Sequence, residues 1–173
     1  MLSSLKHILT HSYKDGMVLF LNSHPESFPE AIQLAITNDQ PYSWRAAWLL
    51  WSCLDQYGER CKIHINEIIE SIPSKQDGHQ RELLKILFEL PLSEDQEGIV
   101  YNLCVNLWES IDKKPSIRYT AFRFMIKIAQ KHHDLMREIH FLTEKHYLES
   151  LSPGVKKGIH KLLQSYGFIQ FNK

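Results

Sequence analysis

Residues 118–125 read RYTAFRFM, and the pattern of this stretch returns along the chain. A basic residue opens each copy, and apolar residues follow three and six positions later, a spacing typical of one face of a helix. The opening residues, separated by 36, 37 and 38 positions, are Arg45, Arg81, Arg118 and Lys156. The apolar residues that follow are Trp48 and Trp51, Leu84 and Leu87, Ala121 and Phe124, and Ile159 and Leu162.

A second pattern agrees with the first. The order glutamate, serine, apolar residue occurs at 70–72, 109–111 and 149–151, with spacings of 39 and 40 positions. A period just under 40 with two helical segments per unit is typical of an α-solenoid, in which stacked helix pairs bury a common core. The sequence therefore predicts an all-α fold of about four helix pairs plus a terminal helix.

Composition agrees with one compact domain over residues 1–173, since 43% of the residues are hydrophobic and 11% are aromatic. No run approaches the roughly 18–20 apolar residues that cross a bilayer, and residues 1–10 lack the apolar segment of a signal peptide. The three cysteines, Cys53, Cys61 and Cys104, form no C-x-x-C motif, and we expect them to be reduced. These features predict a cytoplasmic protein without a membrane partner.

Charge is distributed unevenly although the formal net charge is zero. Residues 1–114 contain 10 basic and 16 acidic side chains, and residues 115–173 contain 10 basic and 4 acidic ones. Such an asymmetry steers a charged partner or favours head-to-tail self-association. The alternative is that surface charge varies between repeats without a functional consequence.

Proline, glycine and polar clusters separate the expected helices. The expected repeats are 14–37, 42–72, 79–111 and 115–149, followed by a terminal helix at 153–166. The clearest helix runs over 42–57, with Gly58 as its expected stop. Ser93 is the expected N-cap of a helix over 94–111, and Asp134 the expected cap of a helix over 135–148.

Two of these helix openings carry a family resemblance. Residues 44–48, WRAAW, and 115–121, PSIRYTA, resemble the start of the first helix of a HEAT repeat, where small residues allow close packing. Residues 14–166 resemble HEAT or armadillo-type repeat proteins, most of all their small bacterial members. The chain departs from that pattern because the turn aspartate and the regular basic residue of the second helix are missing. The resemblance implies a right-handed superhelix whose second helices line a concave, ligand-facing surface.

The four basic residues that open the repeats are the first candidate binding site. Cations one repeat apart match an acidic peptide or a phosphate backbone. Alternatively, each cation pairs with an acid of a neighbouring repeat, because a cation at a helix N-terminus opposes the helix dipole. Trp44, beside Arg45, is a candidate for stacking on a base or an aromatic side chain, or else packs against the preceding loop. Trp48 and Trp51 are expected in the core.

Further binding candidates are polar residues of the second helices and basic residues of the last third. On the expected concave surface these are Asn66, Asn102 and Asn106, with Glu70, Glu109, Glu138 and Lys145. A nucleic-acid-associated protein would instead use Arg118, Arg123, Lys127, Lys156, Lys157 and Lys161.

No catalytic, cofactor-binding or metal-ligating residue is predicted. The sequence contains no G-x-S-x-G, P-loop, G-x-G-x-x-G or H-E-x-x-H motif and no zinc-like spacing of cysteine and histidine. The main enzymatic alternative comes from the HEAT-like alkylpurine DNA glycosylases, which the chain resembles in architecture. They combine a basic concave face with aromatic residues and an aspartate, whereas the basic third here lacks tryptophan.

The sequence therefore favours a non-catalytic protein-binding scaffold or adaptor with a protein or peptide partner. Nucleic-acid binding and self-association remain as alternatives. Whether residues 168–171, FIQF, cover the terminal helix stays open at this point.

Overall fold

The computed structural model describes residues 3–167, and every regular element in that range is a helix. The predicted all-α class is therefore confirmed. The chain forms two compact units, residues 1–92 and residues 93–173. Residues 168–171, for which the sequence left open whether they cover the terminal helix, lie outside the described residues.

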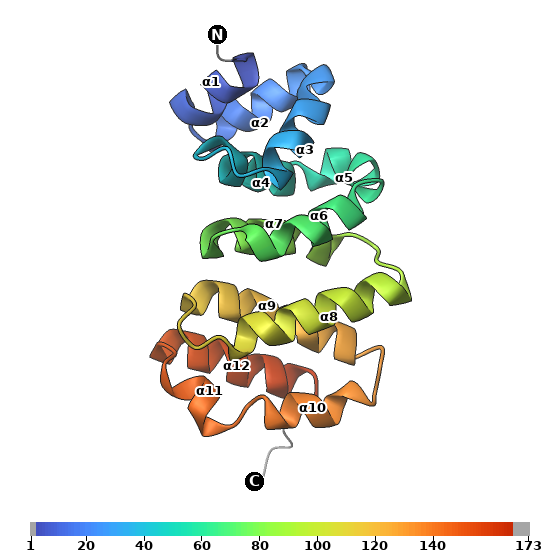
Figure 1. The fold of residues 1–173 in the computed structure, drawn as a ribbon, viewed down its shortest axis with the longest axis vertical. Coiled ribbons are helices and arrows are strands. Elements are labelled where there is room, and N and C mark those ends of the chain that lie inside the picture. Colours follow the sequence, from blue (N-terminus) through green and yellow to red (C-terminus); the bar gives the residue numbers. More distant parts are fainter. Residues whose placement is uncertain (1–2, 168–173) are drawn as a thin grey trace. The chain divides into compact units, whose positions relative to one another are not determined.

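The first unit contains seven α-helices and two short 3₁₀ turns (Figure 1). The α-helices are α1 (Ser4–His11), α2 (Lys14–Ser23), α3 (Phe28–Ile36), α4 (Tyr42–Ser52), α5 (Leu54–Lys62), α6 (Ile65–Ser71) and α7 (Asp77–Glu89). The turns are η1 (Pro25–Ser27) before α3 and η2 (Ile72–Ser74) before α7.

Helix α4 is the centre of the first unit and packs against α1, α2, α3 and α7. Its residues Ala46, Ala47, Leu49 and Leu50 are fully buried. The two alanines leave room for the neighbouring helix backbones to approach, and the two leucines fill the space between them. This burial on several sides explains why the sequence of α4 has no continuous polar face.

The long helix expected over 42–57 is divided at Cys53, and Gly58 does not end it. Gly58 lies inside α5, which continues to Lys62. In α5 the Tyr57 hydroxyl donates to the Leu21 carbonyl at 2.7 Å, and the Tyr57 ring stacks on Phe28 with centroids 5.3 Å apart. Packing against α2 and α3 therefore accompanies a break that local helix propensity does not predict.

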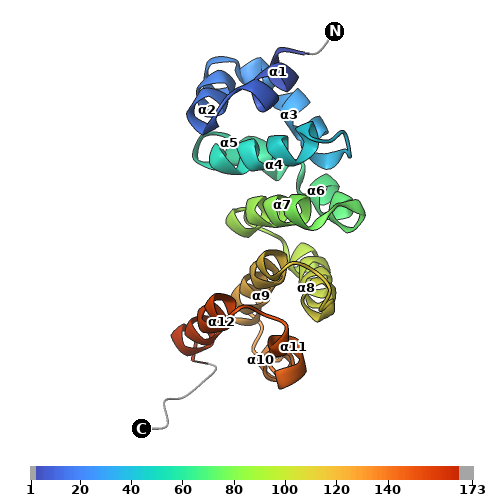
Figure 2. The same ribbon diagram turned by 90° about the vertical axis from the view of Figure 1, so that its left-hand side faces the viewer.

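The second unit contains α8 (Glu94–Glu109), α9 (Pro115–Ala129), α10 (Leu135–Phe141), α11 (Lys145–Glu149) and α12 (Pro153–Ser165). Helix α9 lies between α8 and α12 and also contacts α10 (Figure 2). Its residues Phe122 and Phe124 are buried, and the Trp108 ring of α8 lies 4.6 Å from that of Phe122. The terminal helix expected at 153–166 corresponds to α12.

The cap predicted at Ser93 is confirmed, whereas Asp134 occupies the predicted N-cap position of α10 without capping it. Ser93 accepts from the Gln96 backbone amide, and the Gln96 side chain accepts from the Ser93 amide, which forms a capping box. The Asp134 side chain makes no capping bond. The helix expected over 135–148 is two helices, and the Trp108 indole donates at 2.7 Å to the Leu142 carbonyl at the break.

Candidate functional site

The four basic residues that open the repeats occupy different environments. Arg118 is fully buried. Its guanidinium donates to the Trp108 carbonyl at 2.9 Å, the Ser150 hydroxyl at 2.8 Å and the Tyr147 carbonyl at 2.6 Å, and it lies 4.8 Å from the centre of the Trp108 ring. Burial lowers the pKa of Arg118. Because every bond is internal, Arg118 joins α8, α9 and α11 and does not face a partner.

The other three cations are nearer the surface. Arg45 is half-buried and donates to the Leu9 carbonyl. Arg81 donates to Glu82, its own neighbour in α7, at 2.8 Å. Lys156 is exposed, and its amine donates to the Glu149 carbonyl at 3.3 Å. Three of the four cations, Arg45, Arg118 and Lys156, therefore donate to a backbone carbonyl near the end of another helix. The last carbonyls of a helix have no partner within that helix, so these bonds satisfy them.

The remaining predicted site residues lie on exposed or half-exposed helix surfaces. Asn66 is exposed on α6 of the first unit, and Asn102 and Asn106 are exposed on α8 of the second. Arg123 is exposed on α9, where Lys127 is half-buried with its amine 5.9 Å from the centre of the Phe124 ring. Their role in binding stays a prediction.

Two of the predicted residues, Trp44 and Arg45, line one apolar cavity of the first unit. Its volume is about 230 Å³, and we call it the Trp44 pocket. Trp44 is 39% exposed, and Tyr13, in the connection between α1 and α2, is 93% exposed. The lining residues are Ser12, Tyr13, Lys14, Met17, Trp44, Arg45 and Trp48. Among the described residues, no acidic side chain lines the pocket.

Internal contacts hold the Trp44 pocket in place. The Arg45 guanidinium lies 5.4 Å from the centre of the Trp44 ring and is anchored on the Leu9 carbonyl. The Trp44 backbone amide donates to the Gln40 side chain at 3.4 Å. The sequence pattern missed Tyr13, Lys14 and Met17, which lie outside the repeated register. An aromatic residue, Tyr13, in the short connection between two helices was the available signal.

The core expectation for Trp48 and Trp51 is wrong, because both are half-buried. Trp48 lines the Trp44 pocket. The Lys85 amine lies 3.3 Å from the centre of the Trp51 ring and donates to Glu82 at 2.7 Å. Glu82 is only 1% exposed and also accepts from Arg81. Trp51 is therefore covered by an internal ion cluster.

A second polar cluster closes the end of α3. Lys75 donates to the Ile36 carbonyl at 2.7 Å, and the His79 Nε2 donates to the Ala35 carbonyl at 2.7 Å. The Gln40 amide nitrogen lies 3.1 Å from His79 Nδ1, so Nδ1 is the acceptor and the imidazole is neutral. Burial lowers the pKa of His79 despite its bond to Ala35, and nearby Lys75 lowers it further.

The cysteines are protected from chemistry by their surroundings. Cys53, Cys61 and Cys104 are unpaired and buried. Burial raises the pKa of all three thiols, that of Cys61 to about 11. They are protonated at neutral pH and are poor nucleophiles. Within residues 3–167 no three metal-ligating side chains converge. No helix in the same range is both long and apolar enough to span a bilayer.

Comparison with known proteins identifies the family. Neither the curated proteins nor the solved structures give a significant match to the chain. A family model described as a HEAT repeat domain matches residues 1–166. The match confirms the resemblance seen at the helix openings and the α-solenoid class. Because it covers nearly all of the 173 residues, the chain belongs to the HEAT repeat family.

Proposed function

We propose that this HEAT repeat protein is a non-catalytic protein-binding scaffold of the cytoplasm, and that the Trp44 pocket is a contact point for its partner. The pocket is the observation that carries the proposal. It unites two exposed aromatic rings, a methionine and an arginine, which are residue types enriched at protein interfaces. The three buried, protonated thiols support a reducing compartment and a role without nucleophilic chemistry.

The lining of the pocket specifies the partner's chemistry. The rings of Tyr13, Trp44 and Trp48 offer apolar area to an aromatic or aliphatic side chain, and Lys14 and Arg45 offer positive charge beside it. We therefore propose a peptide segment in which an apolar anchor lies next to a carboxylate. The contacts of Arg45 with the Trp44 ring and with the Leu9 carbonyl limit the side-chain freedom lost on binding.

We propose that exposed asparagines of the second helices also contact the partner. Asn66, Asn102 and Asn106 are exposed amides that donate and accept hydrogen bonds. On the scaffold hypothesis they contact the partner beyond the Trp44 pocket. Their substitution should weaken binding less than the loss of Trp44, because exposed amides exchange water for the partner at little net gain.

The test compares two exposed aromatic residues. Trp44→Ala removes the pocket wall, and Tyr166→Ala removes a ring of similar exposure, 42%, at the end of α12 in the other unit. Partners captured from cytosolic lysate by the immobilised wild type, with nuclease present, are identified and then titrated against all three proteins. We expect Trp44→Ala to weaken binding by about 10-fold or more and Tyr166→Ala to leave it unchanged.

A methionine signal localises the contact. In protein labelled at the methionine methyl groups, Met17 reports on the Trp44 pocket, and the fully buried Met125 serves as the reference. A partner that binds equally to wild type and Trp44→Ala, or that leaves the Met17 resonance unmoved, would show that the Trp44 pocket is not the contact point.

A further inference from the structure

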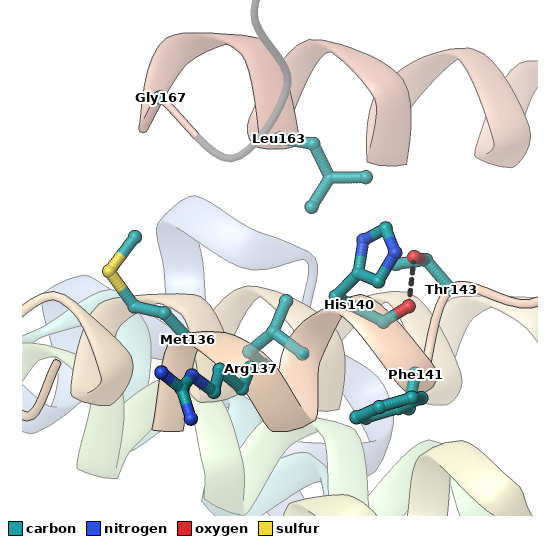
Figure 3. A pocket seen from close by; sticks show the side chains of 8 residues that line it. Met136, Arg137, His140, Phe141, Thr143, Leu163 and Gly167 are labelled. Carbon is teal, nitrogen blue, oxygen red and sulfur yellow. Dashed lines mark hydrogen bonds between the residues drawn. The ribbon is translucent and has the colours of Figure 1, made fainter. Parts of the chain in front are cut away.

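A second apolar surface lies in the other unit, between α10–α11 and α12. Two cavities of about 380 Å³ and about 460 Å³ meet there, because Thr143 and Leu163 line both. Figure 3 shows Leu163 reaching from α12 toward His140 of α10, with Met136 at one end. Phe141 is 63% exposed at this surface. We call the combined cavities the α10–α12 groove.

Both walls of the groove are helix faces. On one side the lining residues are Met136, Ile139 and Thr143, and on the other they are Lys156, Ile159 and Leu163. Met136 and Ile139 lie on one face of α10, with Thr143 in the turn that follows it, and the second set lies on one face of α12. From Lys156 to the end of α12 at Ser165 the wall is about 13 Å long at 1.5 Å per residue, or about two and a half helical turns.

The repeat pattern indicates what shape fits between these walls. Helix α9 is followed by α10 and α11, which supply the second helix of its pair, whereas α12 packs chiefly on α9 and has no following helix within the described residues. A third helix laid between two helical walls can interdigitate its side chains with both. The groove therefore has the geometry of a helix-binding site.

The positive charge around the α10–α12 groove favours one kind of partner helix. Arg137, Lys156 and Lys157 line the groove, together with His140 and His160. In the described part of the chain, no aspartate or glutamate belongs to the lining. An apolar floor with a basic rim is complementary to a helix that has one apolar face and acidic flanks.

We propose that the α10–α12 groove binds an amphipathic helix with acidic flanks from another protein. This is a docking site separate from the Trp44 pocket, and neither proposal depends on the other. The apolar face of the partner helix covers Met136 and Leu163, with the exposed Phe141 at its edge, and its carboxylates lie beside Arg137 and Lys157.

The probe is a capped model peptide of about 18 residues that carries leucine at helical spacing and glutamate on both flanks. A mirror peptide with lysine in place of glutamate has the same apolar face and the opposite charge. Methyl resonances of the full-length protein are followed during titration. Met136 lines the groove, Met17 lines the Trp44 pocket, and the buried Met125 is the reference. We expect the acidic peptide to shift the Met136 methyl resonance saturably and to leave those of Met17 and Met125 unmoved. The basic peptide should shift none of them.

Two pairs of variants test the groove residues. Phe141→Asp places a charge at the apolar edge of the groove, and its control Ile111→Asp changes a residue of similar exposure, 58%, outside the groove. The double variant Arg137→Glu with Lys157→Glu reverses the rim charge, and its control Lys145→Glu reverses an exposed cation on α11 outside the lining. We expect both groove variants to weaken the acidic peptide by about 10-fold or more and both controls to stay within about threefold.

Three results would overturn the proposal. The first is a Met136 resonance that the acidic peptide does not move, which is also the outcome if a segment of this chain already fills the groove. The second is a Met136 position that depends on protein concentration without peptide, which would assign the groove to a second copy. The third is equal affinity of the acidic and basic peptides. None of these results affects the Met17 test of the Trp44 pocket.

Discussion

Polar side chains bind backbone carbonyls near helix ends in both units. Lys75 and His79 bind the last carbonyls of α3, Arg118 binds those near the ends of α8 and α11, and the Trp108 indole binds Leu142 after α10. The last four carbonyls of a helix have no partner within it, and positive groups there also complement the helix dipole. These single residues therefore stabilise the packing of one helix on another.

Arg118 provides the sharpest test of this role. Arg118→Lys keeps the positive charge but cannot reach the three acceptors at Trp108, Tyr147 and Ser150 together. Since buried acceptors would lose partners, we expect the free energy of unfolding to fall by about 3 kcal/mol or more. Urea unfolding measures it, with Arg123→Lys on the exposed side of the same helix as the control, expected within about 0.5 kcal/mol. Equal losses in both variants would contradict a structural role for Arg118.

His79 should make stability depend on pH. Its folded-state pKa is lowered below the ordinary value of 6.5, chiefly by burial, so the unfolded chain binds the proton first as the pH falls. Stability is fully present above about pH 6.5 and declines below it, by at most about 1.4 kcal/mol per pH unit, until the folded pKa is reached. Urea unfolding from pH 8 to pH 5 should show this decline in wild type and a shallower one in His79→Gln. Parallel pH profiles would contradict the assignment.

At the scale of helices, one glycine allows a close approach. A Cβ atom at Gly158 of α12 would lie 3.0 Å from Cε2 of Tyr119, on the neighbouring α9. At Gly98 of α8 no atom lies within 4 Å of a Cβ position. The two glycines are both inside helices of the second unit, so they form a matched pair.

Alanine at these two positions should change the free energy of unfolding differently. Gly98→Ala gains the helix propensity of alanine, and we expect an increase of about 0.5–1 kcal/mol in the free energy of unfolding. Gly158→Ala gains the same propensity but must displace the Tyr119 ring, so we expect no increase or a net loss. Thermal and urea unfolding of the two variants decide this, and equal stabilisation by both would show that Tyr119 moves aside without cost.

At the scale of the whole molecule, charge bears on the nucleic-acid alternative. The formal net charge is zero, and one of the six basic residues expected at such a surface, Arg118, is buried. Duplex affinity rises with the number of phosphates that cations neutralise. We therefore expect binding of a labelled duplex no tighter than about 10⁻⁴ M at physiological salt, measured by fluorescence anisotropy. Tight binding that weakens steeply with added salt would favour the nucleic-acid function over the scaffold.

The sequence by itself determined the helical class, the family and most helix positions. Repeat spacing, helical periodicity and local signals such as Ser93 and Pro115 act over one or two turns, so they can be read without knowing what packs against them. For the same reason the sequence could nominate Trp44 and Arg45, which adjoin each other at the start of one helix.

Only the tertiary structure decided which of these side chains are accessible. Arg45 and Arg118 occupy the same register of the repeat, yet one lines a pocket and the other is buried on three internal acceptors. The break at Cys53 likewise accompanies contacts of Tyr57 with Leu21 and Phe28, which are far from it in sequence. Burial is the sum of all neighbours of a residue, and a periodic pattern records only the neighbours on its own helix.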